Sequence, residues 1–151
     1  MNEEEPHYLL DSNIVSEIIK SAPDFNVIKK LAEHSSDCAI CVPVWEELLF
    51  GVYHLPEGLN KKYLEKFVLE DVQENFPVKN YTEKAARIHA EIRAQLDKIG
   101  KPTQKTDSLI ASIALANHMV RVTRNTKHFE AIQQVCGLEV ENWFQQAQPA
   151  K

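Results

Sequence analysis

The chain has 151 residues, 44% of them hydrophobic and 26% charged, and its formal net charge at pH 7 is −5. This is the length and composition of one globular domain, and the content of four glycines and seven prolines argues against disorder. The acidic net charge excludes a protein that holds nucleic acid mainly through a broad basic face.

Five short runs rich in β-forming residues alternate with helical patterns along the chain. The predicted strands are residues 7–11, 38–42, 75–79, 119–123 and 138–142. The predicted helices are residues 13–21, 22–35, 43–54, 59–73, 81–100, 107–118 and 126–134. This alternation predicts a layered α/β domain with a central, mostly parallel sheet of four to five short strands.

The spacing of apolar residues predicts the buried face of several helices. The predicted faces are Phe25, Ile28 and Leu31; Val44, Leu48 and Val52; Leu59, Tyr63, Phe67, Val68 and Val72; and Ile110, Ala111 and Ala114. Thr82 precedes the helix 81–100 in the manner of a helix cap, and Gly100 is positioned to end that helix.

We expect a single domain at 7–147, an N-terminal extension at 1–6 and a C-terminal tail at 148–151. The extension "MNEEEP" is acidic where a secretory signal is basic, and no apolar stretch approaches the roughly 20 residues that span a bilayer. The CxxC pair of Cys38 and Cys41 lies in a predicted strand, where positions i and i+3 face opposite sides. We therefore expect a cytoplasmic protein with no membrane association, no redox pair and no cysteine zinc site.

Side chains that can bind a cation follow the predicted strands. They are Asp11, Ser12 and Asn13 after the first strand, Glu46 and Glu47 after the second, Asp107 at the start of the helix 107–118, and Thr123, Arg124 and Asn125 after the fourth. Loops that follow parallel strands meet at one edge of the sheet. Converging carboxylates repel one another unless they share a cation, and oxygen ligands without a His or Cys cluster favour Mg²⁺ or Mn²⁺ over zinc. Helix capping is the alternative explanation for Asp11, Asn13, Asp107 and Asn125.

Four segments form an ordered set of motifs: "LLDSNIVSEI", "VPVWEELLFGV", the stretch from "RIHAEIR" to "NTKHFE", and "LEVENW". In order and spacing they resemble the VapC-like PIN-domain ribonucleases of prokaryotic toxin-antitoxin modules. The resemblance covers nearly the whole chain, and its most specific parts are "LDSN", "EELLFG" and the block from "TDSLIA" to "TRNTKHF". It implies a three-layer α/β/α PIN-like fold and a Mg²⁺-dependent endoribonuclease, with Mn²⁺ as a plausible substitute.

Position by position, the resemblance implies that Asp11, Glu47 and Asp107 are metal ligands and that Asn125 completes the catalytic set. A metal-activated water would attack the RNA phosphodiester and leave a 5′-phosphate and a 3′-hydroxyl. The remaining implied roles are positioning by Ser12, Asn13 and Thr123. Arg93, Arg124 and Lys127 are candidates for contacts to backbone phosphates, with simple solvation of these side chains as the alternative. The chain departs from the family pattern at Ser12, where threonine is usual, at Gln104, where glycine is frequent, and at Asn125, where many members carry a fourth acid.

The resemblance also implies partners for the protein. A small cognate antitoxin would cover the site, and the toxin itself would form a homodimer. The aromatic residues Trp45, Phe50, Tyr53 and Tyr63 are candidates for the antitoxin interface, with burial in the core as the alternative.

The sequence offers three alternatives to a toxin ribonuclease. A haloacid-dehalogenase-like phosphatase needs an aspartate where the chain has Asn13, and the small size and toxin-type motifs argue against a PIN-like nuclease acting on DNA. A catalytically silent PIN-fold module that sequesters an antitoxin or RNA stays open, because Asn125 and Gln104 depart from the family pattern.

Overall fold

The computed structural model describes residues 6–144. The predicted tail at 148–151, the domain boundary at 147 and residues 1–5 of the predicted extension lie outside the described residues.

A five-stranded sheet forms the centre of the molecule. Its strands are β1 (Tyr8–Leu10), β2 (Cys38–Cys41), β3 (Val78–Lys79), β4 (Val120–Val122) and β5 (Val140–Glu141). They are arranged in the order β3-β2-β1-β4-β5, and every neighbouring pair is parallel. Each strand lies within its predicted range, so the predicted parallel sheet is confirmed.

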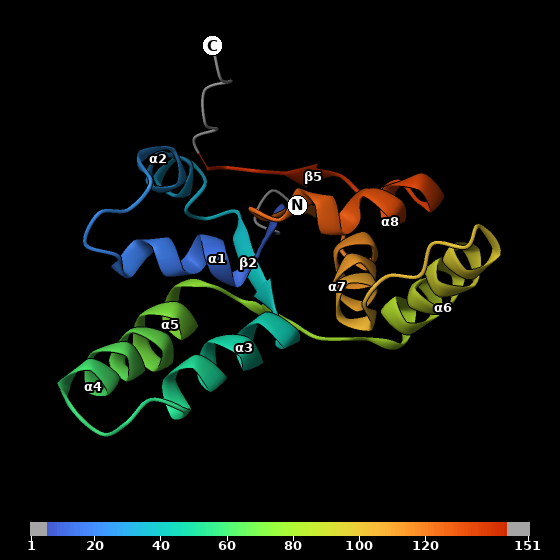
Figure 1. The fold of residues 1–151 in the computed structure, drawn as a ribbon. Helices are drawn as coiled ribbons and strands as arrows, with labels where there is room; N and C mark the ends of the chain where they lie inside the picture. The colour runs from blue at the N-terminus through green and yellow to red at the C-terminus, as the bar shows by residue number, and fades with distance from the viewer. Residues whose placement is uncertain (1–5, 145–151) are drawn as a thin grey trace, which may run out of the picture.

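Helices cover the sheet on both sides. They are α1 (Ser12–Val15) with the 3₁₀ turn η1 (Ser16–Ile19), α2 (Phe25–Glu33), α3 (Val42–Tyr53), α4 (Leu59–Lys66), the π-helical η2 (Phe67–Val72), α5 (Gln73–Asn75), α6 (Glu83–Lys98), α7 (Lys105–Ala116), the 3₁₀ turn η3 (Thr126–Phe129) and α8 (Glu130–Val135). Figure 1 shows α6, α7 and α8 on one side of the central strands and α1 to α5 on the other. The three-layer α/β/α architecture is therefore confirmed. Within residues 6–144, no helix combines the length and the apolar character needed to cross a membrane.

The predicted core faces of α3 and α7 are buried. Val44, Leu48 and Val52 of α3 pack into the core, as do Ile110, Ala111 and Ala114 of α7. The small side chains of α7 allow that helix to approach the sheet closely, and Ser108, Ser112 and Ile113 are buried with them.

Two predicted core faces are partly wrong. Phe25 is 74% exposed, Leu59 85% and Tyr63 60%. Phe25 is the first residue of α2, directly after the N-cap Asp24, so it precedes the part of the helix that packs. α4 buries none of its residues, and burial begins only at Phe67, where the wider π-helical turns start.

The ends of α6 are those that the sequence predicts. Thr82 Oγ1 accepts a hydrogen bond from Ala85 N at 3.1 Å, and Gly100 adopts a left-handed φ of +68°. Lys101 N donates to Leu96 O at 2.9 Å, as in a Schellman motif, which turns the chain back toward α7. α7 itself begins at Lys105, not at Asp107.

Candidate active site

Asp11 lies at the carboxyl end of β1 and is held at both of its carboxylate oxygens. Oδ1 accepts a hydrogen bond from Ser12 N at 2.7 Å and lies 3.2 Å from Arg121 Nη2. Oδ2 accepts from Thr123 Oγ1 at 2.6 Å and from Asn13 Nδ2 at 3.2 Å. Asp11 therefore caps α1, as the capping explanation requires, and is also oriented by Arg121 of β4 and by Thr123, the residue after that strand.

The loop after β4 is tied to the loop after β1 by further hydrogen bonds. Thr123 Oγ1 accepts from Asn125 N at 3.0 Å, and Asn13 Oδ1 accepts from Arg124 N at 3.3 Å. Asn125 is exposed, and its recorded bond in this network is made by its backbone. The residues predicted to support the site thus lie together around Asp11.

Asp107 faces the same space from α7. It lies in the first turn, two positions after Lys105, so the expectation that it starts or caps the helix is wrong. Its Oδ2 is 4.0 Å from His128 Nδ1. Burial raises the pKa of Asp107; the charges of His128 and Arg121 act to lower it, and the charge of Asp11 acts to raise it. These couplings indicate that the two carboxylates share one region of the sheet edge.

Glu47 lies on the wall of a groove of about 390 Å³ that Ser12, Ser16 and Phe50 also line. Both Glu46 and Glu47 are exposed. Within residues 6–144, no group of three or more His, Cys, Asp or Glu side chains is placed to hold a metal ion. The structure therefore brings together two of the three predicted ligands, with the third in the groove that adjoins Ser12.

The donor atoms of the site fit a hard divalent cation. Asp11 and Asp107 offer carboxylate oxygens, and no cysteine or histidine cluster competes with them among the described residues. Mg²⁺ commonly binds proteins through one or two carboxylates and keeps several waters, so two nearby acids are sufficient for such a site.

Arg121 is the site residue that sequence reasoning missed. It lies in β4 between Val120 and Val122, is 1% exposed and contacts Asp11. The signal was present in the sequence, because a charged residue in the middle of the predicted buried strand "MVRVT" requires a partner.

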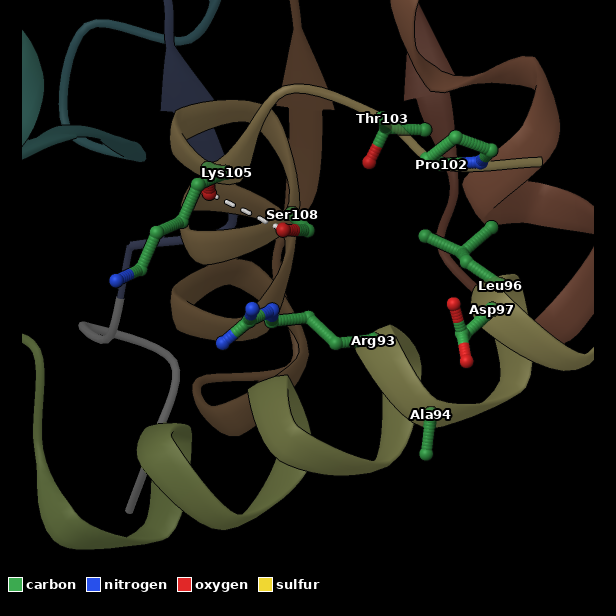
Figure 2. Close-up of a pocket in the computed structure, with 8 residues that line it drawn as sticks. All are labelled: Arg93, Ala94, Leu96, Asp97, Pro102, Thr103, Lys105 and Ser108. Atoms are coloured by element: carbon green, nitrogen blue, oxygen red, sulfur yellow. Dashed lines mark hydrogen bonds between the residues drawn. The ribbon is translucent and has the colours of Figure 1, made fainter. Parts of the chain in front are cut away.

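The three predicted phosphate-binding residues are exposed and lie on different elements. Arg93 extends from α6 toward α7 in a pocket of about 370 Å³ (Figure 2), whose other lining residues are Ala94, Leu96, Asp97, Pro102, Thr103, Lys105 and Ser108. Lys105 and Ser108 lie close to Asp107 in sequence, in the first turn of α7. The guanidinium carbon of Arg124 lies 4.5 Å from the centre of the Phe144 ring, and Lys127 lies in η3.

Comparison with known proteins agrees with the fold. The PIN domain family model matches residues 8–134. The chain is 31% identical over 138 residues to ribonuclease VapC2 of Rickettsia felis and, also at 31% over 138 residues, to the tRNA(fMet)-specific endonuclease VapC of Shigella flexneri. Both alignments cover 90% of this chain and 97% of the relative.

A solved structure shows the same architecture. The structure of VapBC2 from Rickettsia felis bound to a DNA fragment from their promoter matches with a TM-score of 0.72 at 29% identity, covering 90% of this chain and 98% of that chain. With the family model covering most of the sequence, the chain belongs to the PIN-domain family and, within it, to the VapC ribonucleases.

Proposed function

We propose that this protein is the toxin of a VapBC-type toxin-antitoxin system, an endoribonuclease that cleaves RNA phosphodiesters with Mg²⁺, or with Mn²⁺ in its place. Nucleases of the PIN-domain family depend in general on a divalent metal. The observation that carries the proposal is the Asp11 carboxylate, clamped by Thr123 and Asn13 beside Asp107 at the carboxyl ends of β1 and β4.

The protein's part in the reaction is to hold acidic groups in fixed orientations. Thr123 Oγ1 and Ser12 N each hold one oxygen of Asp11, so its carboxylate is set before a ligand arrives. Asp107 is the second acidic ligand in this proposal, and Glu47 is the third. A bound divalent ion would supply an acidified water and polarise the phosphoryl oxygen.

The proposed substrate is RNA, held by its backbone phosphates. Arg93, Arg124 and Lys127 are exposed and carry charges that phosphates attract. One relative is named a tRNA(fMet)-specific endonuclease, so initiator tRNA is the first substrate to test.

The proposed partner is a small antitoxin, bound by a homodimer of the toxin in the cytoplasm. The expected interface residues Phe50, Tyr53 and Tyr63 are 64%, 56% and 60% exposed, so the alternative that they are core residues is wrong. Trp45 is partly buried against the core. Exposed aromatic side chains beside a groove are typical of a surface that a partner covers.

The proposal is tested by incubating the protein with total RNA and with initiator tRNA, in Mg²⁺ or in EDTA. We expect cleavage in Mg²⁺, none in EDTA, and roughly a hundredfold or greater loss of rate in Asp11→Asn. The matched control is Asp37→Asn, which removes an acid directly before β2, at the amino edge of the sheet.

Cleavage that survives in EDTA, or in Asp11→Asn at the rate of the control, rules out the metal mechanism. If no RNA is cut under any condition while a small protein encoded beside this one binds tightly, the protein is a silent PIN-fold binding module.

A further inference from the structure

Arg121 is a charged side chain enclosed in the core beside the acidic pair. Its side chain is 2% exposed, and it lies in the strand β4 between two buried valines. Its guanidinium carbon lies 5.5 Å from the centre of the Phe129 ring, which covers one side of the group. The arginine therefore cannot turn outward to solvent without opening the packing between β4 and η3.

The guanidinium makes one ion pair and leaves two nitrogen atoms without a protein partner. Nη2 lies 3.2 Å from Asp11 Oδ1, whereas Nε and Nη1 are buried and form no hydrogen bond. A buried charge is retained at a considerable cost unless it compensates another charge. The charge that Arg121 compensates is that of the Asp11 carboxylate. The charge of Arg121 also interacts favourably with the Asp107 carboxylate.

Both carboxylate oxygens of Asp11 already have protein partners: Oδ1 accepts a hydrogen bond from Ser12 N at 2.7 Å and lies 3.2 Å from Arg121 Nη2. The other oxygen, Oδ2, already accepts hydrogen bonds from Thr123 and Asn13. A divalent ion bound to Asp11 would stand close to the guanidinium, and two positive charges repel strongly in a poorly hydrated site. The guanidinium cannot be screened by water as a surface arginine is, because it is enclosed.

We propose that Arg121 is a built-in counter-cation that competes with the divalent metal for Asp11 and thereby weakens metal binding in the free protein. This inference rests on the proposed metal-dependent function and names a positioning residue for it. The position of Arg121 also explains how the carboxylates of Asp11 and Asp107 coexist at the sheet edge. Arg121 supplies a positive charge that reduces their mutual repulsion before a metal binds.

The test is direct binding of Mn²⁺, followed by the electron paramagnetic resonance signal of the free ion, with no RNA present. Arg121→Met keeps a long apolar stem and removes the charge, and we expect it to bind Mn²⁺ roughly tenfold or more tightly than the natural protein. The matched control is Arg87→Met, which removes the same charge from an exposed position on α6 and should leave Mn²⁺ affinity unchanged.

Equal or weaker Mn²⁺ binding by Arg121→Met overturns the inference, as does an equal gain in Arg87→Met or a lack of Mn²⁺ binding by all three proteins. RNA cleavage is measured separately. If Arg121→Met binds Mn²⁺ more tightly and neither protein cuts RNA, the nuclease function fails while the role of Arg121 stands.

A second measurement on the natural protein covers the case in which Arg121→Met does not fold. The Nε–Hε resonance of Arg121 should exchange slowly with water, because the group is buried, and should shift when Mg²⁺ is added. The corresponding resonance of Arg87 should not shift. An Arg121 resonance that is unmoved at saturating Mg²⁺ overturns the inference.

Discussion

At the scale of single residues, the hydroxyl of Thr123 organises the candidate site. It donates to Asp11 at 2.6 Å across 112 residues of sequence and accepts from Asn125 N at 3.0 Å, so it joins the ends of β1 and β4. Thr123 is fully buried, which keeps this hydrogen bond away from competing water. A carboxylate oriented in this way resembles a metal ligand supported by a second layer of hydrogen bonds.

Replacing Thr123 by valine should lower the rate of RNA cleavage by roughly ten- to a hundredfold, because Asp11 Oδ2 loses its shortest hydrogen bond while the side-chain volume is kept. The rate with a saturating RNA substrate in Mg²⁺ measures this effect. Thr123→Ser keeps the hydroxyl and is the matched control, expected to cleave at nearly the natural rate. Equal rates for the valine and serine variants would show that the hydrogen bond does not support catalysis.

At the scale of elements, the junction of α6 and α7 holds Asp107 in place. His89 of α6 is 3% exposed, and its Nε2 lies 2.8 Å from Ser108 Oγ, while its Nδ1 lies 3.0 Å from Tyr81 OH. Because Ser108 Oγ already donates to Lys105 O, it accepts from His89 Nε2. The neutral ring thus links α6 to the residue after Asp107.

The pH dependence of stability should reveal this junction. Burial lowers the pKa of His89 below its ordinary value of 6.5, and the charges of Arg93 and Lys105 lower it further. The unfolded chain therefore binds a proton at His89 more readily than the folded one. The stability that neutral His89 contributes is present above pH 6.5 and is lost as the pH falls through the folded-state pKa of His89.

We expect the free energy of unfolding, measured by denaturant titration, to decrease between about pH 7 and pH 5. His89→Gln, which keeps a group able to hydrogen-bond Ser108 and does not titrate, should show a smaller decrease. The carboxylates titrate in both proteins, so the difference between their pH-dependent free energies of unfolding reports the contribution of His89. Parallel curves for the two proteins would contradict the assignment.

At the scale of the whole molecule, the exposed aromatic side chains of α3 and α4 form a surface that the fold does not use. Phe50, Tyr53 and Tyr63 remain largely exposed, and Phe50 lines the groove that leads to Ser12 and Glu47. A partner seated on this surface would reach the candidate active site. One surface would therefore serve both recognition and inhibition by an antitoxin.

Phe50→Ala should weaken binding of the cognate antitoxin by roughly tenfold or more without changing thermal stability, since the side chain is exposed in the free toxin. Isothermal titration with the purified antitoxin measures the affinity. Phe25→Ala removes an aromatic ring of equal size and similar exposure from α2 and should bind normally. An unchanged affinity for Phe50→Ala would place the interface elsewhere.

The sequence by itself determined the elements and much of the site. Strand ranges, the Thr82 cap and the Gly100 turn follow from local rules, because the alternation of side chains and the backbone freedom of glycine act over a few residues. The clustering of Asp11, Asn13 and Thr123 was also predictable, because parallel strands bring their carboxyl ends to one edge.

Only the tertiary structure decided which residues are enclosed. It placed the charge of Arg121 against Asp11 and left Phe50 and Leu59 on the surface, and it put Glu47 on the wall of a groove that Ser12 also lines. Periodicity along a helix or strand shows which side chains share a face, but not what lies opposite that face. The physical reason is that burial and the pairing of charges depend on elements that are distant in sequence.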